Sequence, residues 1–466
     1  MPGPYLIGVD EGTQSAKVVV YDSAGAVVSQ GTQALRPMSR PANGVAVHPD
    51  DDLWDSLVGA AREAMNGFHG DAREIVGVGL CTIRCCKAFL RADGSLAEPV
   101  ISWMDDRSYR PYLPDDPGLA YATTSSGYIV HRLTGERRDT AANNILLQWP
   151  IDTDSWSWSD HAELFRAFEL TRELLFDLQL PGQIAGRVTP EAAAATGIPA
   201  GLPVVQTAND KAVEALGAGL LGETTALVSL GTYIAAMVHG RENRQEPTHF
   251  WTNFASIPHR YLYESDGVRR GMWTLTWFVQ LLGAEVAELE REAERVPAGC
   301  DGLMTVLDWL APTDRPFRKG VMLGFDARHT RAHVYRSILE GVALTMKHNV
   351  DGMRDELGLE LTDIVISGGG AASPLFMQIF ADSFGLPASR STEQGGASLG
   401  AAICAAVGGG VHPDFETAVR EMTGPRESFS PGSAAADTYR QMNEGVYQTI
   451  RDGTDDVLAR SYPLFH

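Results

Sequence analysis

Short apolar runs separated by polar turns open the chain. One run extends from Tyr5 to Val9, a second, KVVVYD, follows the turn at Gly12, and a third begins after Gly25. Apolar runs of this length, bounded by glycine and small polar residues, predict β-strands joined by tight turns. Residues 5–32 are therefore expected to form three antiparallel strands.

Helical and strand patterns alternate through the rest of the first half. A helix is expected from Asp50, where acidic residues precede apolar residues at Leu53 and Leu57, and a strand is expected from Ile75 to Cys81. Further elements are expected as a strand at 87–93, a loop at 107–117, a helix at 128–135, a helix at 161–168, a strand at 202–208 and a helix of small residues at 211–221. This mixture indicates an α/β domain.

The second half repeats the opening pattern. The stretch ALVSLGTYIAAMV has an apolar strand, a Gly-Thr turn and a second apolar strand, as LIGVDEGTQSAKVVV has near the N-terminus. A long helical pattern, HTRAHVYRSILEGVALTMKHNVDGMRDEL, then leads to the strand DIVIS, three glycines and further helices. A length of 466 residues also suits two domains, so we expect one at 1–220 and a related one at 221–466.

Charge and composition narrow the classes of partner. The 38 basic and 59 acidic residues give a net charge of −21, which disfavours nucleic acid and anionic membrane surfaces as partners. The N-terminus lacks the basic and apolar regions of a signal peptide, and no apolar stretch approaches the roughly 20 residues that span a bilayer. A cytoplasmic protein is expected.

The five cysteines do not predict a disulfide framework. Their odd number and wide spread favour reduced thiols. Cys81, Cys85 and Cys86 do cluster, but no second pair of Cys or His residues follows at zinc-ligand spacing. Packing as small apolar side chains is the favoured interpretation.

The opening turn carries more polar chemistry than a hairpin needs. Its glycine and short hydroxyl side chains suit a phosphate, and Asp10 could hold a magnesium ion through that ion's waters. The stretch is not a P-loop, because the turn leads into a strand and not into a helix. From the residues alone, an ordinary hairpin with a polar turn is equally consistent with this pattern.

Other candidate residues stand where strands end. Asp210 follows an apolar strand and precedes a helix, so it is either a general base or a helix cap, and Asn209 could take the capping role. Arg84 and Trp103 could orient a polar ligand, the alternatives being a surface salt bridge and a buried aromatic. The glycines after Ser367 could offer a flat backbone surface to a base or phosphate, or only a tight turn.

Six stretches, taken in order, resemble successive motifs of the FGGY family of carbohydrate kinases. They are GVDEGTQSAKVVVYD, PVISWMDDR, VVQTANDKAVEALGAG, LVSLGT, HTRAHVYRSILEGVAL and ISGGGAASPLFMQIFADSFGLPASRSTEQGGASLGAAICAA. The resemblance extends from Gly8 to about Gly410. It implies two RNase H-like domains of the actin-like ATPase type, with ATP, magnesium and a sugar meeting in the cleft between them.

The resemblance also implies roles for individual residues. Asp10 matches the residue that organises magnesium, Asp210 matches the catalytic base and is expected to contact the sugar, and Arg84 matches a substrate-contacting arginine of glycerol-kinase-like members. Trp103 is expected to act with Arg84 in sugar recognition. The residues that match the nucleotide-binding motifs are Gly12, Thr13, Gln14, Ser15 and Lys17 in the first phosphate loop, Gly231 and Thr232 in the second, and Gly369, Gly370 and Ala371 in the adenosine motif.

The chain departs from the family pattern in three places. Only residues 108–130 separate WMDDR from HRLTGE, where the family usually carries a longer sugar-side insertion, so the sugar pocket is expected to be reshaped or more open. Cys85 replaces a glutamate that glycerol-kinase-like members place beside the arginine. Lys211 follows the base directly; a solvent-facing position in the first helical turn is favoured over contact with Asp210 or with substrate.

The expected function is ATP-dependent phosphorylation of a hydroxyl of a small neutral sugar or sugar alcohol. The alternative is an ATP-binding regulator, or a degenerate kinase, of the same fold. Retention of both Asp10 and Asp210 argues against that alternative, because a pure binder needs no base. The sequence leaves open which sugar is used, which hydroxyl is phosphorylated, and whether the chain forms a homodimer.

Overall fold

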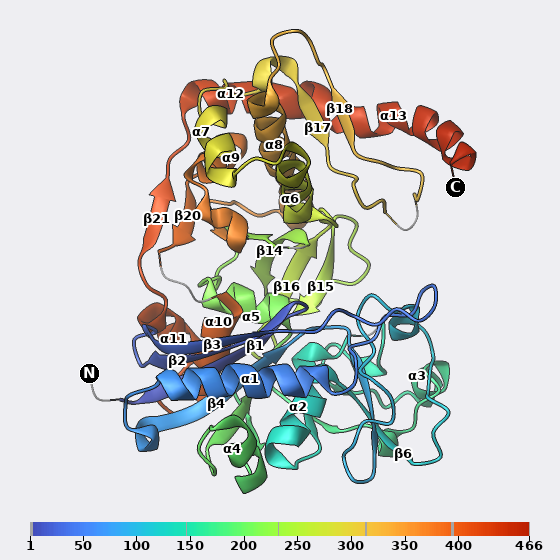
Figure 1. The fold of residues 1–466 in the computed structure, drawn as a ribbon, viewed down its shortest axis with the longest axis vertical. Coiled ribbons are helices and arrows are strands. Elements are labelled where there is room, and N and C mark those ends of the chain that lie inside the picture. Colours follow the sequence, from blue (N-terminus) through green and yellow to red (C-terminus); the bar gives the residue numbers. More distant parts are fainter. Residues whose placement is uncertain (1–2, 146, 232, 313–314, 393–395, 466) are drawn as a thin grey trace.

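The computed structural model describes residues 3–145, 147–231, 233–312, 315–392 and 396–465. Two β-sheets lie one above the other in the long direction of the molecule, each with its own helices (Figure 1). The two-domain α/β architecture expected from the sequence is confirmed.

The first sheet has six strands. In the spatial order β11-β12-β4-β1-β2-β3 they are Ile184–Arg187, Pro203–Gln206, Ile75–Thr82, Tyr5–Glu11, Ser15–Asp22 and Val27–Ala34. β1, β2 and β3 pair in antiparallel fashion, which confirms the three strands predicted at the N-terminus, and β4 and β12 continue the sheet in parallel. The polar ends of β1, β4 and β12 therefore meet at one edge of the sheet.

The second sheet repeats this arrangement and extends it. In the order β15-β16-β14-β13-β19-β20-β21 its strands are Phe250–Phe254, Tyr261–Ser265, Ile234–Gly240, Thr225–Leu230, Asp363–Ser367, Ala388–Ser391 and Arg426–Phe429. β13, β14 and β16 are antiparallel, and β19 and β20 continue in parallel from β13. The two strand-turn-strand patterns in the sequence thus form equivalent hairpins, β1–β2 and β13–β14.

Helices cover the sheets, and four short strand pairs lie in the connections. The helices are α1 Asp52–Gly67, α2 Ser125–Thr134, α3 Ala162–Ala167, α4 Pro190–Thr196, α5 Asp210–Gly217, α6 Gly271–Leu282, α7 Val286–Ala293, α8 Arg331–Leu357, α9 Pro374–Phe384, α10 Gly396–Gly408, α11 Phe415–Met422, α12 Ser433–Met442 and α13 Gln448–Ser461. The short pairs are β5 Lys87–Arg91 with β6 Leu119–Thr124, β7 Arg138–Thr140 with β10 Asp177–Gln179, β8 Ile151–Asp152 with β9 Ser157–Trp158, and β17 Met304–Val306 with β18 Val321–Leu323.

Several predicted elements differ at their ends. The helix expected at 211–221 ends at Gly217, and the strand expected at 202–208 is the shorter β12. The segment 107–117, expected to be a loop, begins with a 3-10 turn, Asp106–Tyr109. These are boundary differences, since the type of each main element is as predicted.

Helix α10 joins the two halves of the chain, because it packs on the first sheet although it lies late in the sequence. A Cβ atom added at Gly8 of β1 would lie 1.9 Å from the carbonyl oxygen of Ser398, and one added at Gly79 of β4 would lie 1.8 Å from that of Ala401. Only glycine permits so close an approach of helix and sheet. The proposed division at 220/221 separates the two sheets, but α10 and α11 contribute to the core of the first.

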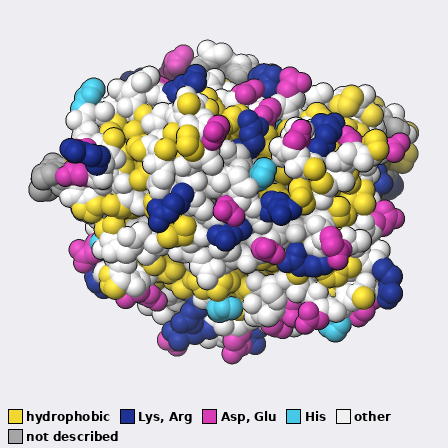
Figure 2. All heavy atoms as spheres, turned by 90° about the horizontal axis from the view of Figure 1, so that it is seen from below, with side chains coloured by type: hydrophobic (Ala, Val, Ile, Leu, Met, Phe, Trp, Pro, Cys, Tyr) yellow, Lys and Arg dark blue, Asp and Glu magenta, His cyan; other side chains and the backbone are white. Residues whose placement is uncertain are grey.

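The cysteines fit the expectation of reduced thiols that pack as small apolar side chains. Figure 2 shows positive and negative side chains interspersed on the face seen from below, without a field of one sign. All five cysteines are free and buried, and burial raises the pKa of Cys85 to about 11. Within the part of the chain that the structure describes, no helix is both long and apolar enough to cross a membrane.

Candidate active site

Two turns of equivalent hairpins carry the predicted phosphate loops. In the β1–β2 turn the Gly12 N–H donates to the carbonyl oxygen of Ser15 at 3.0 Å, and Lys17 lies opposite Asp10 in the strand register. Gly231 follows β13 in the second hairpin, and Thr232 lies outside the described residues. The first turn is closed by its own backbone hydrogen bond, and Lys17 adds a cation near it.

The adenosine motif packs against the end of β13. Gly368 has a φ of +83°, and a Cβ atom there would lie 2.5 Å from the carbonyl oxygen of Leu230. A Cβ atom at Gly370 would lie 2.9 Å from the Leu230 side chain, whereas one at Gly369 would meet nothing within 4 Å. Gly368 therefore requires glycine for its backbone conformation, and the motif is brought close to the second phosphate turn.

Asp210 begins α5 and does not cap it. The side chain of Asn209 accepts from the Ala212 N–H at 3.2 Å and is the cap. Among the described residues, the Asp210 carboxylate accepts a hydrogen bond from the neighbouring Lys211 N–H at 2.9 Å and lies 3.7 Å from Nε of Arg84. Burial raises the pKa of Asp210, although the charges of Arg84 and Lys211 oppose that shift. The placement leaves a carboxylate available as a general base.

The electrostatic surroundings of Asp10 are set by burial and by two nearby carboxylates. Burial, and next the negative charges of Asp210 and Glu214, raise the pKa of Asp10 to about 7. A divalent cation would relieve this crowding, so the donor set fits magnesium. Among the described residues no group of three or more His, Cys, Asp or Glu side chains is arranged to hold a metal.

Arg84 joins the first domain to the second. Its Nη1 and Nη2 donate to the two carboxylate oxygens of Glu264 at 2.7 and 2.8 Å, and its guanidinium lies over the ring of Trp251 with 5.1 Å to the centroid. The Glu264 side chain is only 1% exposed. Arg84 is therefore not part of a surface salt bridge; it lies in the interior between the two sheets, beside Asp210.

Trp103 contacts the first phosphate turn. Its indole Nε1 donates to the hydroxyl oxygen of Thr13 at 3.3 Å, and the side chain is partly buried against the core of the first domain. A residue predicted to contact sugar and a residue predicted to contact phosphate are thus adjacent, as a transfer between the two ligands requires.

The prediction that Lys211 faces solvent is wrong. Its ammonium donates to Glu214 at 3.0 Å and to the hydroxyl of Ser229 at 2.7 Å, and Glu214 also accepts from Ser229 and from Ser367 at 2.6 Å. Burial lowers the pKa of Lys211, but the charges of Glu214 and Asp210 outweigh this effect and raise it. The first turn of α5 is not at the surface because the second sheet packs against it.

This Lys211–Glu214 cluster connects three motifs. Ser229 precedes the second phosphate turn, Ser367 precedes the adenosine motif, and both bond to the helix that begins with Asp210. Sequence reasoning did not identify Glu214 or Ser367, or the Glu264 and Trp251 pair. A charged residue within the aromatic strand YLYES was the one local signal for Glu264, since an ionised group in a buried strand needs a partner.

Replacing Lys211 with Met is expected to lower the free energy of unfolding by about 1.5–3 kcal/mol, because Glu214 loses a charged hydrogen-bond partner while buried. Urea unfolding of Lys211→Met beside the parent measures this difference. Lys319→Met removes a lysine at the surface and is the control, with little expected change. Equal unfolding free energies for the two variants would show that the cluster adds no stability.

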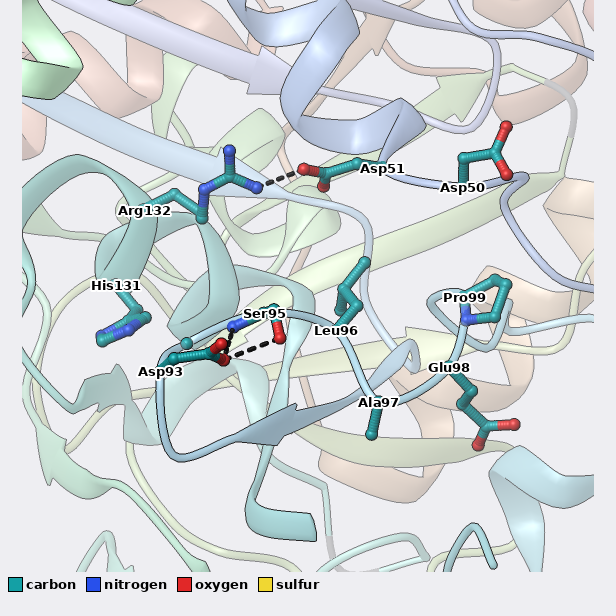
Figure 3. A pocket seen from close by; sticks show the side chains of 11 residues that line it. Asp50, Asp51, Asp93, Ser95, Leu96, Ala97, Glu98, Pro99, His131 and Arg132 are labelled. Carbon is teal, nitrogen blue, oxygen red and sulfur yellow. Dashed lines mark hydrogen bonds and ion pairs between the residues drawn. The ribbon is translucent and has the colours of Figure 1, made fainter. Parts of the chain in front are cut away.

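A separate pocket of about 680 Å³ lies in the first domain between the loop after β5 and the helix ends of α1 and α2 (Figure 3). Arg132 is paired with Asp51 there, and Asp93 accepts from the N–H and hydroxyl of Ser95 at 2.9 and 2.7 Å. None of the predicted site residues lines it. Its charged residues Arg132, Asp51 and Asp93 already have partners within the chain.

Comparisons with known proteins show similarity to one family over most of the chain. Residues 5–112 match the model described as FGGY family of carbohydrate kinases, N-terminal domain, and residues 226–409 match the model for its C-terminal domain. A protein of Escherichia coli (strain K12) named Uncharacterized sugar kinase YgcE is 48% identical, over 100% of this chain and 97% of its own.

Solved structures show the same fold. The xylulose kinase from Rhodospirillum rubrum superposes with a TM-score of 0.83 at 25% identity, covering 98% of this chain and 100% of its own. The gluconate kinase from Lactobacillus acidophilus gives a TM-score of 0.83 at 18% identity, over 98% and 99% of the two chains. The expected fold, two RNase H-like domains of the actin-like ATPase type, is confirmed.

Proposed function

Since the chain belongs to the FGGY family of carbohydrate kinases, we propose that it transfers the γ-phosphoryl group of ATP to a hydroxyl of a small sugar or sugar alcohol, with Asp210 as general base. The observation that carries this proposal is the placement of Asp210. Asn209 caps the helix, so the carboxylate of Asp210 is not needed for that role and lies beside Arg84. A regulator that only binds nucleotide would not need this arrangement.

The chain's own residues divide the work of phosphoryl transfer. Asp210 accepts the proton of the attacking hydroxyl, and Arg84 and Trp103 orient the acceptor. The remaining task is to hold the phosphates, which we assign to Gly12, Thr13, Gln14, Ser15, Lys17, Gly231 and Thr232, with Gly369, Gly370 and Ala371 against the adenosine. Phosphoryl transfer depends mainly on such positioning and on neutralising charge.

Magnesium bound by Asp10 and the ATP phosphates would supply charge neutralisation in this site. The fit rests on the buried carboxylate of Asp10, whose pKa is raised first by burial and then by the negative charges of Asp210 and Glu214. The first and second phosphate turns belong to different sheets, so binding one nucleotide brings the two domains together.

A coupled assay of ADP release tests the function directly. The purified chain with MgATP is expected to release ADP faster when a suitable acceptor is added, because a productive acceptor completes the site around Asp210. Pentuloses, hexuloses, tetritols and glycerol are the acceptors to screen, with sugar-free ATP hydrolysis as the baseline. ATP binding without stimulation by any sugar or polyol would favour a nucleotide-binding regulator instead.

A further inference from the structure

Glu264 and Trp251, on two neighbouring strands of the second sheet, together form the binding site for the Arg84 side chain. The two residues are directly opposite each other in the β15–β16 register. Glu264 binds both terminal nitrogens of Arg84, and Trp251 provides an aromatic face for the same guanidinium. A bidentate pair of this kind is geometrically specific, so the orientation of Arg84 is set by the second domain.

The contacts of Arg84 limit what it can offer to a substrate. The two terminal nitrogens, Nη1 and Nη2, could together bind a substrate carboxylate, but they already donate to the carboxylate oxygens of Glu264 at 2.7 and 2.8 Å. Its Nε is 3.7 Å from Asp210. The guanidinium has five N–H donors in all, so single N–H groups remain for hydroxyl oxygens. Arg84 is therefore suited to single hydroxyl groups and not to a carboxylate.

The negative charges around Arg84 also disfavour a substrate carboxylate. Burial raises the pKa of Asp210, the positive charges of Arg84 and Lys211 oppose that shift, and the negative charge of Glu264 adds to it. Asp210 and Glu264 both lie against Arg84, at 3.7 and 2.7 Å. An acceptor that carries its own carboxylate would bring another negative group beside Glu264 and Asp210. Unfavourable pairing of like charges is a common means of rejecting a wrong ligand.

We propose that Glu264 is a specificity determinant that confines the acceptor to uncharged polyols and sugars and excludes sugar acids of the aldonate class. The proposal rests on the proposed kinase function and deepens it. Glu264 acts from the second domain by occupying the arginine fork that would otherwise accept a carboxylate. The Cys85 thiol beside Arg84 adds no charge to this exclusion.

The test compares kcat/KM for the best uncharged acceptor with that for the aldonate of the same carbon number. The parent enzyme is expected to prefer the uncharged acceptor by about 10²-fold or more. Glu264→Gln keeps the shape of the side chain but removes its charge, and it is expected to reduce this preference at least tenfold, mainly through better use of the aldonate. Glu264→Asp keeps the charge and is expected to keep the preference.

Glu292→Gln is the control, because it removes one carboxylate from a surface pair with Arg331. A folded Glu264→Gln variant that keeps the parent's preference for the uncharged acceptor would overturn the proposal. The proposal would also be overturned if the parent enzyme itself used the uncharged acceptor and the aldonate with comparable kcat/KM. If the parent phosphorylates neither acceptor class, the kinase function itself fails and the specificity proposal fails with it. Thermal melting of each variant identifies those that are folded.

Discussion

Replacing Asp210 with Asn is expected to lower sugar-dependent ADP release by about 10²–10⁴-fold, the usual loss on removing a general base. The substitution keeps the size of the side chain and removes only its proton-accepting carboxylate. Binding of MgATP should change little, because the phosphate turns are built from other residues. Turnover is measured with the best acceptor, and nucleotide affinity is measured by calorimetry. Both measurements are made on the variant and on the parent.

Asp437→Asn is a matched control, since Asp437 lies on the exposed surface of α12 and pairs with Arg440. It should leave turnover unchanged. If Asp210 capped α5, its replacement by Asn would also do little, because the two residues cap about equally well. Turnover of Asp210→Asn within a few-fold of the parent would therefore contradict its role as base. Loss of turnover together with ATP binding and a lower melting temperature would assign it a structural role.

Replacing Arg84 with Ala should lower the free energy of unfolding by about 3–5 kcal/mol, because Glu264 then stays buried without its counter-charge. It should also impair sugar use far more than ATP binding, since unpaired substrate hydroxyls are costly. Guanidinium unfolding measures the first effect, and the Michaelis constants for the two substrates separate the second.

The double variant Arg84→Ala/Glu264→Gln distinguishes the two contributions of Arg84. Removing the charge of Glu264 should recover a large part of the lost stability, because the unpaired buried charge is its main cause. Sugar use should stay low, since the contacts of Arg84 with the acceptor are still missing. Equal stability of the single and double variants would show that Glu264 is not the residue left uncompensated, and unchanged sugar kinetics in either would remove Arg84 from the sugar site.

Features that depend on neighbours in the sequence were predictable. The hairpins of both domains arise from apolar runs interrupted by glycine turns, and the structure forms them in equivalent places. The role of Asn209 as helix cap was an option visible in the sequence, because the residue stands directly before the helix. The local pattern also located Asp10 near the end of β1 and Asp210 between β12 and α5, where it is the first residue of the helix.

Features that depend on the approach of the second sheet were not predictable. Lys211 is in a first helical turn, where exposure is the usual outcome, but its surroundings are set by Ser229 on a strand that comes later in the chain. The pairing of Arg84 with Glu264 links positions 180 residues apart. The local sequence pattern around each residue does not specify its partner in the other domain. These contacts are determined by how the two domains pack together.

The packing of α10 on the first sheet has a consequence for protein synthesis. The glycine face of β1 and β4, at Gly8 and Gly79, is covered by a helix that ends at Gly408. A nascent chain therefore carries an unfinished first domain, with apolar surface open to solvent, until most of the protein has left the ribosome. Such exposed surface promotes aggregation, so the first domain is expected to be most prone to aggregate before the segment that forms α10 has been synthesised.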